Sequence, residues 1–240
     1  MSNAQKPHKE EEPLDYLYMK TIHCPVCDAE FMDFAVRKSK LRLIDADTDF
    51  KNNYHVIDPN HYEVMLCSFC GYAALQNYFT RISSRQQDMI QTKVSPNYRP
   101  VEYPIPLSLE HVIARYKQAL VCANAMEAKA SQKGITWLKM AWAYRGHDEK
   151  SELACLKGAF MGLKEAYSTE NFPLGSMDEP TTKYIMGELA RRLGDYEEAL
   201  RLIGSVIVSR GIQSSLKDRA QNVKELIKEA QTPTAAEAAE

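Results

Sequence analysis

The chain has 240 residues, 45% of them hydrophobic, and its 30 basic and 32 acidic side chains give a formal net charge of −2. This composition is that of a globular protein able to bury a sizeable core, and it excludes fibrous and low-complexity chains. The first thirty residues lack a charged segment followed by an apolar one, and the apolar stretches stay under ten residues. We therefore expect a cytoplasmic protein without a membrane span.

The two ends of the chain differ from its middle in composition. Residues 1–13 and 232–240 are polar, so we expect both to be disordered tails. Residues 14–80 carry short alternating segments, at 40–43 and 62–65, that favour strands. This part of the chain is therefore predicted to be a small β domain.

Residues 81–107 are predicted to be a connector. A short helix can start after Ser83 or Ser84, and prolines then keep the chain extended. From Ser108 to about residue 231 the apolar residues recur with a helical period, and Ser108 suits an N-cap. Six helices are predicted here, with the first break at Gly134. Short loops between them indicate antiparallel neighbours.

Four of the six cysteines form two pairs, each with two residues between its members: Cys24, Cys27, Cys67 and Cys70. Without a signal peptide, such pairs indicate a metal or redox site and not a disulfide framework. Two tight turns, brought together by strand pairing, can place four sulfurs around the tetrahedral Zn²⁺ ion that prefers them. Gly71, and less ideally Asp28, follows each second cysteine, where such a turn needs a positive φ.

The cysteine spacing leaves the metal open, because a rubredoxin-like iron site uses the same four thiolates. A redox-active pair is disfavoured, since no thioredoxin-like βαβ setting is visible. A metal held by four cysteines has no free coordination position and cannot activate water. We therefore expect a structural metal and no catalytic residue. Cys122 and Cys155 stand alone in apolar helical patterns and are interpreted as small buried hydrophobes.

The acidic segment at residues 45–49, DADTD, resembles the opening of a calcium loop. Phe50 stands where that loop needs a glycine, and Val56 where it needs a bidentate glutamate. We interpret the segment as a solvated turn or strand edge.

Residues 187–200 resemble a tetratricopeptide repeat, a family of paired helices that pack closely at small side chains. The matching positions are Gly187, Gly194, Asp195, Tyr196 and Ala199. Residues 137–144 resemble the first helix of another repeat, but Ala141 lies 46 residues before its equivalent, Gly187, against a repeat of about 34. The resemblance implies a compact bundle of repeat-like hairpins.

Across roughly residues 20–225 the chain resembles the bacterial family called domain of unknown function 2225. The segments that carry the resemblance are CPVC at 24–27, DTDF at 47–50 and CSFCGYAA at 67–74. It implies a bacterial cytoplasmic protein with no established activity. The predicted fold class is α+β, with a zinc-ribbon-like domain at 14–80 and an all-α, tetratricopeptide-like bundle at 108–231.

A protein-interaction adaptor is the first functional hypothesis, because stacked helical hairpins expose a groove that can bind a peptide or helix of a partner protein. The candidate partner-binding residues are Trp142, Arg145, Tyr184, Arg191 and Arg192. The alternative for these residues is that Trp142 is core and the arginines are solvated. No motif of a nucleotide-binding enzyme, serine hydrolase or zinc peptidase is present, so no enzymatic activity is expected.

Nucleic-acid binding through the cysteine-bearing part is the second hypothesis, and an iron electron carrier is the third. A phosphate-binding face needs clustered Lys and Arg, whereas residues 14–80 hold six basic and nine acidic side chains. The one basic run, from Arg37 to Arg42, has only Phe34 as a nearby aromatic residue. We therefore expect neither a nucleic-acid nor a membrane partner.

Overall fold

The computed structural model describes residues 12–232. The tails expected at 1–13 and 232–240 lie outside this range except for positions 12, 13 and 232. Pro13 begins a short 3-10 turn, Pro13–Tyr16, that leads directly into the first strand.

Three antiparallel hairpins occupy the first part of the described chain: β1 (Leu17–His23) with β2 (Glu30–Val36), β3 (Leu43–Ala46) with β4 (Asn52–Tyr54), and β5 (Val64–Leu66) with β6 (Ala73–Leu75). The first cysteine pair lies in the turn between β1 and β2, where His23 faces Glu30. The second lies between β5 and β6, where Leu66 faces Ala73. The acidic segment forms the tip of the middle hairpin.

The strand expected at 40–43 is wrong. Residues Lys38–Lys40 form a 3-10 turn, and β3 begins at Leu43. The strand expected at 62–65 overlaps β5 but starts two residues later, because Pro59–Tyr62 forms another 3-10 turn capped by Asp58. Alternation of polar and apolar residues located the hairpins and misplaced their ends.

From residue 76 to the end of the described chain, the secondary-structure elements are helices joined by loops. The α-helices are α1 (Gln76–Phe79), α2 (Ser84–Lys93), α3 (Leu109–Ala125), α4 (Ala130–Tyr144), α5 (Glu149–Thr169), α6 (Glu179–Arg192), α7 (Tyr196–Val208) and α8 (Ser214–Gln231). The last six confirm the helices expected after Ser108. The Ser108 hydroxyl caps α3 by accepting the amide of His111, and Ser83 caps α2. The α+β fold class is therefore correct.

The helix break expected at Gly134 is wrong. Gly134 lies inside α4, and the turn between α3 and α4 falls at residues 126–129. A Cβ atom on Gly134 would lie 2.9 Å from the backbone nitrogen of Leu163, and one on Gly162 would lie 2.8 Å from the Gly134 Cα. Glycine is present because the backbones of α4 and α5 touch at this point.

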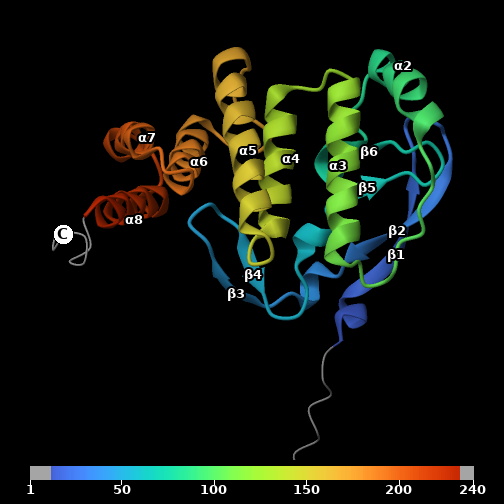
Figure 1. The fold of residues 1–240 in the computed structure, drawn as a ribbon, viewed down its shortest axis with the longest axis horizontal. Helices are drawn as coiled ribbons and strands as arrows, with labels where there is room; N and C mark the ends of the chain where they lie inside the picture. Colours follow the sequence, from blue (N-terminus) through green and yellow to red (C-terminus); the bar gives the residue numbers. More distant parts are fainter. Residues whose placement is uncertain (1–11, 233–240) are drawn as a thin grey trace, which may run out of the picture.

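Helices α3, α4 and α5 form a row of side-by-side helices, and α6, α7 and α8 continue it at one end (Figure 1). Strands β5 and β6 pack against α3, whereas the β3–β4 hairpin reaches under α4 and α5 toward α6 (Figure 1). At Gly187 of α6 an added Cβ would lie 2.8 Å from Ile203 of α7. This close approach agrees with the small residue that the repeat resemblance implies there.

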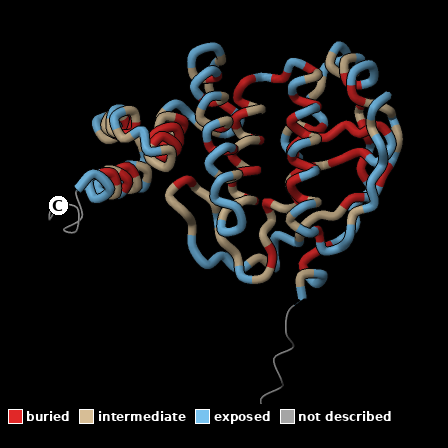
Figure 2. Tube along the Cα trace, in the orientation of Figure 1, coloured by how far each residue is buried: buried red, intermediate tan, exposed pale blue. Residues whose placement is uncertain are grey.

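The buried side chains of the strand part and the helical part form one continuous cluster, from Tyr16 to Ile227 (Figure 2). The boundaries drawn at residues 80 and 108 follow the change from strands to helices. They do not separate two cores, because α3 supplies apolar side chains to both sides of the boundary.

Candidate metal centre and helical groove

The four paired cysteines converge on one point. Their Sγ atoms all lie within 4.8 Å of one another, with 3.6 Å between Cys24 and Cys70 and 3.6 Å between Cys27 and Cys67. Four sulfurs bound to one ion at about 2.3 Å form a tetrahedron whose edges are about 3.8 Å long. The donor atoms and their separations therefore fit a thiolate-bound metal ion. Cys24, Cys27, Cys67 and Cys70 are called the cysteine cluster below.

Two equivalent turns carry the cysteine cluster. The amide of Asp28 donates to the carbonyl of Cys24, and the amide of Gly71 donates to the carbonyl of Cys67, each over 3.0 Å. Asp28 has φ +63° and Gly71 has φ +74°. The positive φ expected after each second cysteine is thereby confirmed, and it turns both amide backbones around the sulfurs.

Helices α2 and α3 hold these turns from outside. Gln118 of α3 donates to the carbonyl of Gly71 over 2.8 Å, and Gln91 of α2 donates to the carbonyl of Val26. A Cβ on Gly71 would lie 2.3 Å from the ring of Tyr98, so the glycine also permits a close approach there. Cys122 lies beneath the second turn, and burial raises the pKa of its thiol to about 12, which agrees with an inert buried side chain.

Electrostatics inside the cysteine cluster favour a bound cation. The hydrogen bond with Cys67 raises the pKa of Cys24 to about 12, while hydrogen bonds from Cys24 and Cys70 lower the pKa of Cys67 to about 2. One thiolate is thus stabilised by neighbouring thiols. Ionising all four at these distances requires a positive ion between them. Among the residues that the structure describes, this is the one such group of three or more potential ligands.

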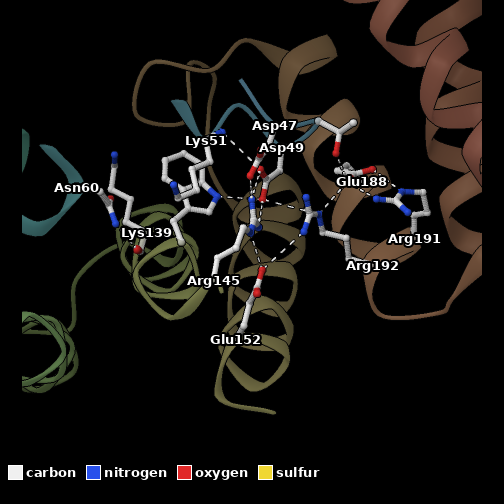
Figure 3. Close-up of polar contacts among 12 residues, drawn as sticks. Asp47, Asp49, Lys51, Asn60, Lys139, Arg145, Glu152, Glu188, Arg191 and Arg192 are labelled. Atoms are coloured by element: carbon white, nitrogen blue, oxygen red, sulfur yellow. Dashed lines mark hydrogen bonds and ion pairs between the residues drawn. The ribbon is translucent and has the colours of Figure 1, made fainter. Parts of the chain in front are cut away.

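The five candidate partner-binding residues surround the tip of the β3–β4 hairpin, at residues 47–50. We call the set of these five side chains the helical groove, after the groove that the adaptor hypothesis expects. Asp49 is fully buried, and Arg145 of α4 binds it with Nη2 2.6 Å from Asp49 Oδ2 (Figure 3). The same guanidinium contacts Asp47 at 2.5 Å and Glu152 at 2.7 Å. The acidic segment is a strand end followed by a turn, as interpreted from the sequence, but the expectation that it is solvated is wrong for Asp49.

The remaining candidates hold the same segment. The indole of Trp142 donates to Asp49 over 3.0 Å, and the hydroxyl of Tyr184 donates to the carbonyl of Thr48 over 2.6 Å. The Thr48 hydroxyl in turn donates to Glu188, whose carboxylate also binds the two arginines of α6 (Figure 3): Arg191 and Arg192. All five candidates are thus brought together, and each is engaged by the chain itself. Trp142 is a polar partner more than a core residue, and the arginines are paired and not solvated.

The positive charge of Arg145 explains how Asp49 can stay ionised although it is buried. Burial by itself would raise the pKa of Asp49, but the hydrogen bond and charge of Arg145 outweigh it and lower the pKa below its ordinary value. Burial opposes the charge of Arg145 as well, but the carboxylate of Asp49 raises the pKa of the guanidinium well above its usual range. The segment and the helices are therefore joined by a matched set of buried charges.

A second buried ion pair was missed by sequence reasoning. Arg115 of α3 binds both carboxylate oxygens of Asp33 in β2 and donates to the carbonyl of Val64 in β5. The available signal was an arginine next to the apolar stripe of α3, between Val112 and Tyr116. Its partner, 82 residues away, has no local signature.

Fold and site together define an α+β protein in which a four-cysteine cluster is docked on a row of antiparallel helices. The chain belongs to the family described as uncharacterized proteins conserved in bacteria (DUF2225), whose family model matches residues 17–227. No curated protein matches the chain, and neither does any solved structure. None of the helices within residues 12–232 combines the length and apolar character needed to cross a bilayer.

The substitution Cys67→Ser tests the role of the cysteine cluster. We expect loss of bound metal and a lower melting temperature, because a structural metal held by thiolates contributes on the order of 10 kcal/mol to folding. Since the core is shared, helix content measured by circular dichroism should fall in the same transition. Cys155→Ser is the control: it also removes a buried thiol, but it should keep one metal ion per chain. Equal melting temperatures for Cys67→Ser and wild type, with no metal in either, would contradict the assignment.

The substitution Asp49→Asn tests the buried charges of the helical groove. At neutral pH we expect a loss of about 3 kcal/mol in the free energy of unfolding, since one member of a buried ion pair is removed. Because the folded pKa of Asp49 lies below its unfolded value of 3.8, this stabilisation is present above pH 3.8 and disappears as the pH falls further. Asp45→Asn, at an exposed carboxylate of the same hairpin, should change stability by about 0.5 kcal/mol or less. Denaturant titrations from neutral to acidic pH measure both, and a pH-independent difference would rule out this role.

Proposed function

We propose that the chain is a bacterial cytoplasmic protein-interaction adaptor, that a structural zinc ion fills the cysteine cluster, and that the protein has no catalytic activity. The observation that carries the proposal is the way the helical groove holds the turn at residues 47–50 through backbone, charge and aromatic contacts. The metal, in this proposal, fixes the strand hairpins against α2 and α3.

The zinc assignment rests on the donor set and its surroundings. Four thiolates at tetrahedral spacing are typical of closed structural zinc sites. Cys24 and Cys67 are fully buried and Cys70 is 6% exposed, while helix side chains cover both turns. Iron bound by the same thiolates would make an electron carrier. The contacts from Gln91 and Gln118 favour the structural role, because they tie each turn to a helix.

The adaptor assignment rests on three contacts with residues 47–50. Arg145 takes a carboxylate with two nitrogens, the geometry that makes arginine selective for acidic groups. Tyr184 donates to the backbone carbonyl of Thr48, a contact that does not depend on the side chain at that position. Phe50 packs on the Tyr184 ring with 5.1 Å between ring centroids, and the guanidinium of Arg219 in α8 lies 5.2 Å from the centroid of the Phe50 ring. An acidic turn that ends in an aromatic residue is therefore the class of ligand that fits.

Residues 47–50 act, in this proposal, as a resident competitor for partner segments of the same class. A tethered segment has an effective local concentration in the millimolar range. A partner must therefore either bind more tightly or meet the groove when the hairpin tip is released. Loosening the resident segment should accordingly increase binding of a free peptide.

A peptide of residues 45–52, DADTDFKN, tests this function with a scrambled peptide as control. We expect the variant Asp47→Asn/Asp49→Asn to bind the labelled peptide at least about 100-fold more tightly than wild type, because its own segment competes less well. Phe50→Ala, which loosens the segment and keeps the ion pairs, should act in the same direction. Fluorescence anisotropy gives the affinities, and circular dichroism verifies that each variant is folded. Folded variants that bind the two peptides equally, or neither of them, would refute the adaptor proposal.

A further inference from the structure

A second groove lies against the β1–β2 hairpin, next to the helical groove. It encloses about 960 Å³ between that hairpin, the β5–β6 hairpin, α1, α4 and the loop at residues 175–176. Its lining includes six cationic side chains: Lys20, Arg37, Lys38, Lys40, Arg81 and Lys139. We call this feature the basic groove. It shares no lining residue with the helical groove.

Positive charge dominates the basic groove. Its one lining carboxylate, Glu63, is bound by Lys139 over 2.6 Å. Within residues 12–232 the other five cations form no ion pair with a carboxylate, and all five are exposed. Lys40 donates to the backbone carbonyl of Asp15, which positions its ammonium group without neutralising it. Five uncompensated charges therefore face one cavity.

The net charge of residues 14–80 conceals this distribution. Asp47 and Asp49 form ion pairs with Arg145 of α4, and Asp33 forms one with Arg115 of α3. These carboxylates lie in ion pairs with helices, whereas four cations of the same segment are exposed: Lys20, Arg37, Lys38 and Lys40. An acidic segment thus presents a basic surface, and its net charge carries no argument against an anionic ligand.

We propose that the basic groove binds single-stranded nucleic acid. The volume of the groove falls within the range of small-molecule sites, but such sites need few charges, whereas five separate cations suit a chain of phosphates. Tyr18 and Tyr78 also line the groove, and Tyr18 is 38% exposed with the Arg37 guanidinium 5.2 Å from its ring centroid. Aromatic and guanidinium planes among cations are the surface on which unpaired bases stack.

Only single-stranded nucleic acid can use both the cations and the exposed Tyr18 ring of the basic groove. A duplex turns its phosphates outward and hides the faces of its bases in the stack, so Tyr18 would have no base to contact. The basic groove adjoins the helical groove, since Lys139 lies 4.9 Å from the ring centroid of Trp142. The two proposals are tested with different ligands and with variants at different residues, so the failure of one is distinguishable from the failure of the other.

Anisotropy of a labelled oligothymidylate of about twelve nucleotides, titrated with the full chain, tests the proposal. Between about 50 and 200 mM salt, five phosphate contacts predict a slope of about −3.5 for log K against log salt concentration. The variant Lys20→Ala/Arg37→Ala/Arg81→Ala leaves two contacts and should show a slope of about −1.4, with affinity reduced about tenfold or more at the lowest salt. Tyr18→Ala should weaken binding about fivefold by loss of stacking.

The matched control removes three exposed cations elsewhere, in Lys157→Ala/Arg210→Ala/Lys217→Ala, and should leave affinity and slope unchanged. Equal losses in the control and the groove variant would overturn the proposal, as would no binding by wild type at the lowest salt. A duplex or inorganic polyphosphate that binds as tightly as the oligothymidylate, with Tyr18→Ala without effect, would overturn the single-strand assignment. Thermal melts of each variant verify that the fold is retained.

Discussion

The hairpins of this protein depend on one constraint: the four sulfur atoms of the cysteine cluster lie at the separations of a tetrahedral metal site. Sulfurs at 3.6 Å cannot all carry charge without a cation between them. To bring them together, two separate hairpins must present the same turn, with Asp28 and Gly71 in the same backbone conformation. One side chain of α2 and one of α3 each donate a hydrogen bond to the backbone of one of these turns. The cluster therefore joins the hairpins to each other and to the helical row.

Buried ion pairs make the second connection between the two parts. Asp33 and Asp49 come from strand hairpins, and the arginines that neutralise them, Arg115 and Arg145, come from α3 and α4. Each pair spans more than eighty residues of sequence. Their formation explains why one core runs through the molecule. The chain's own acidic segment fills the helical groove, whereas the basic groove is lined by five cations that have no carboxylate partner among residues 12–232.

The sequence supported accurate expectations wherever the cause was local. The spacing of the cysteines predicted the cysteine cluster. Ser108 predicted the N-cap of α3, and helical periodicity predicted the six helices from α3 to α8. Gly134 was misread, because a glycine that permits α4 and α5 to touch looks the same in sequence as one that ends a helix. The acidic segment was misread for a related reason: the fate of Asp49 depends on Arg145, 96 residues away, and no periodicity reports such a partner. The side chains chosen as a partner surface did share one groove, but what occupies it could be seen only in three dimensions.

X-ray absorption at the metal edge, on protein purified without chelator and analysed for its elements, tests the central claim most directly. The account predicts one zinc ion per chain, with four sulfur neighbours at about 2.3 Å and no lighter atom in the first shell. An oxygen or nitrogen neighbour would mean an open coordination position, and the non-catalytic assignment would then fail. Iron in place of zinc, or no bound metal at all, would contradict the structural role of the cysteine cluster.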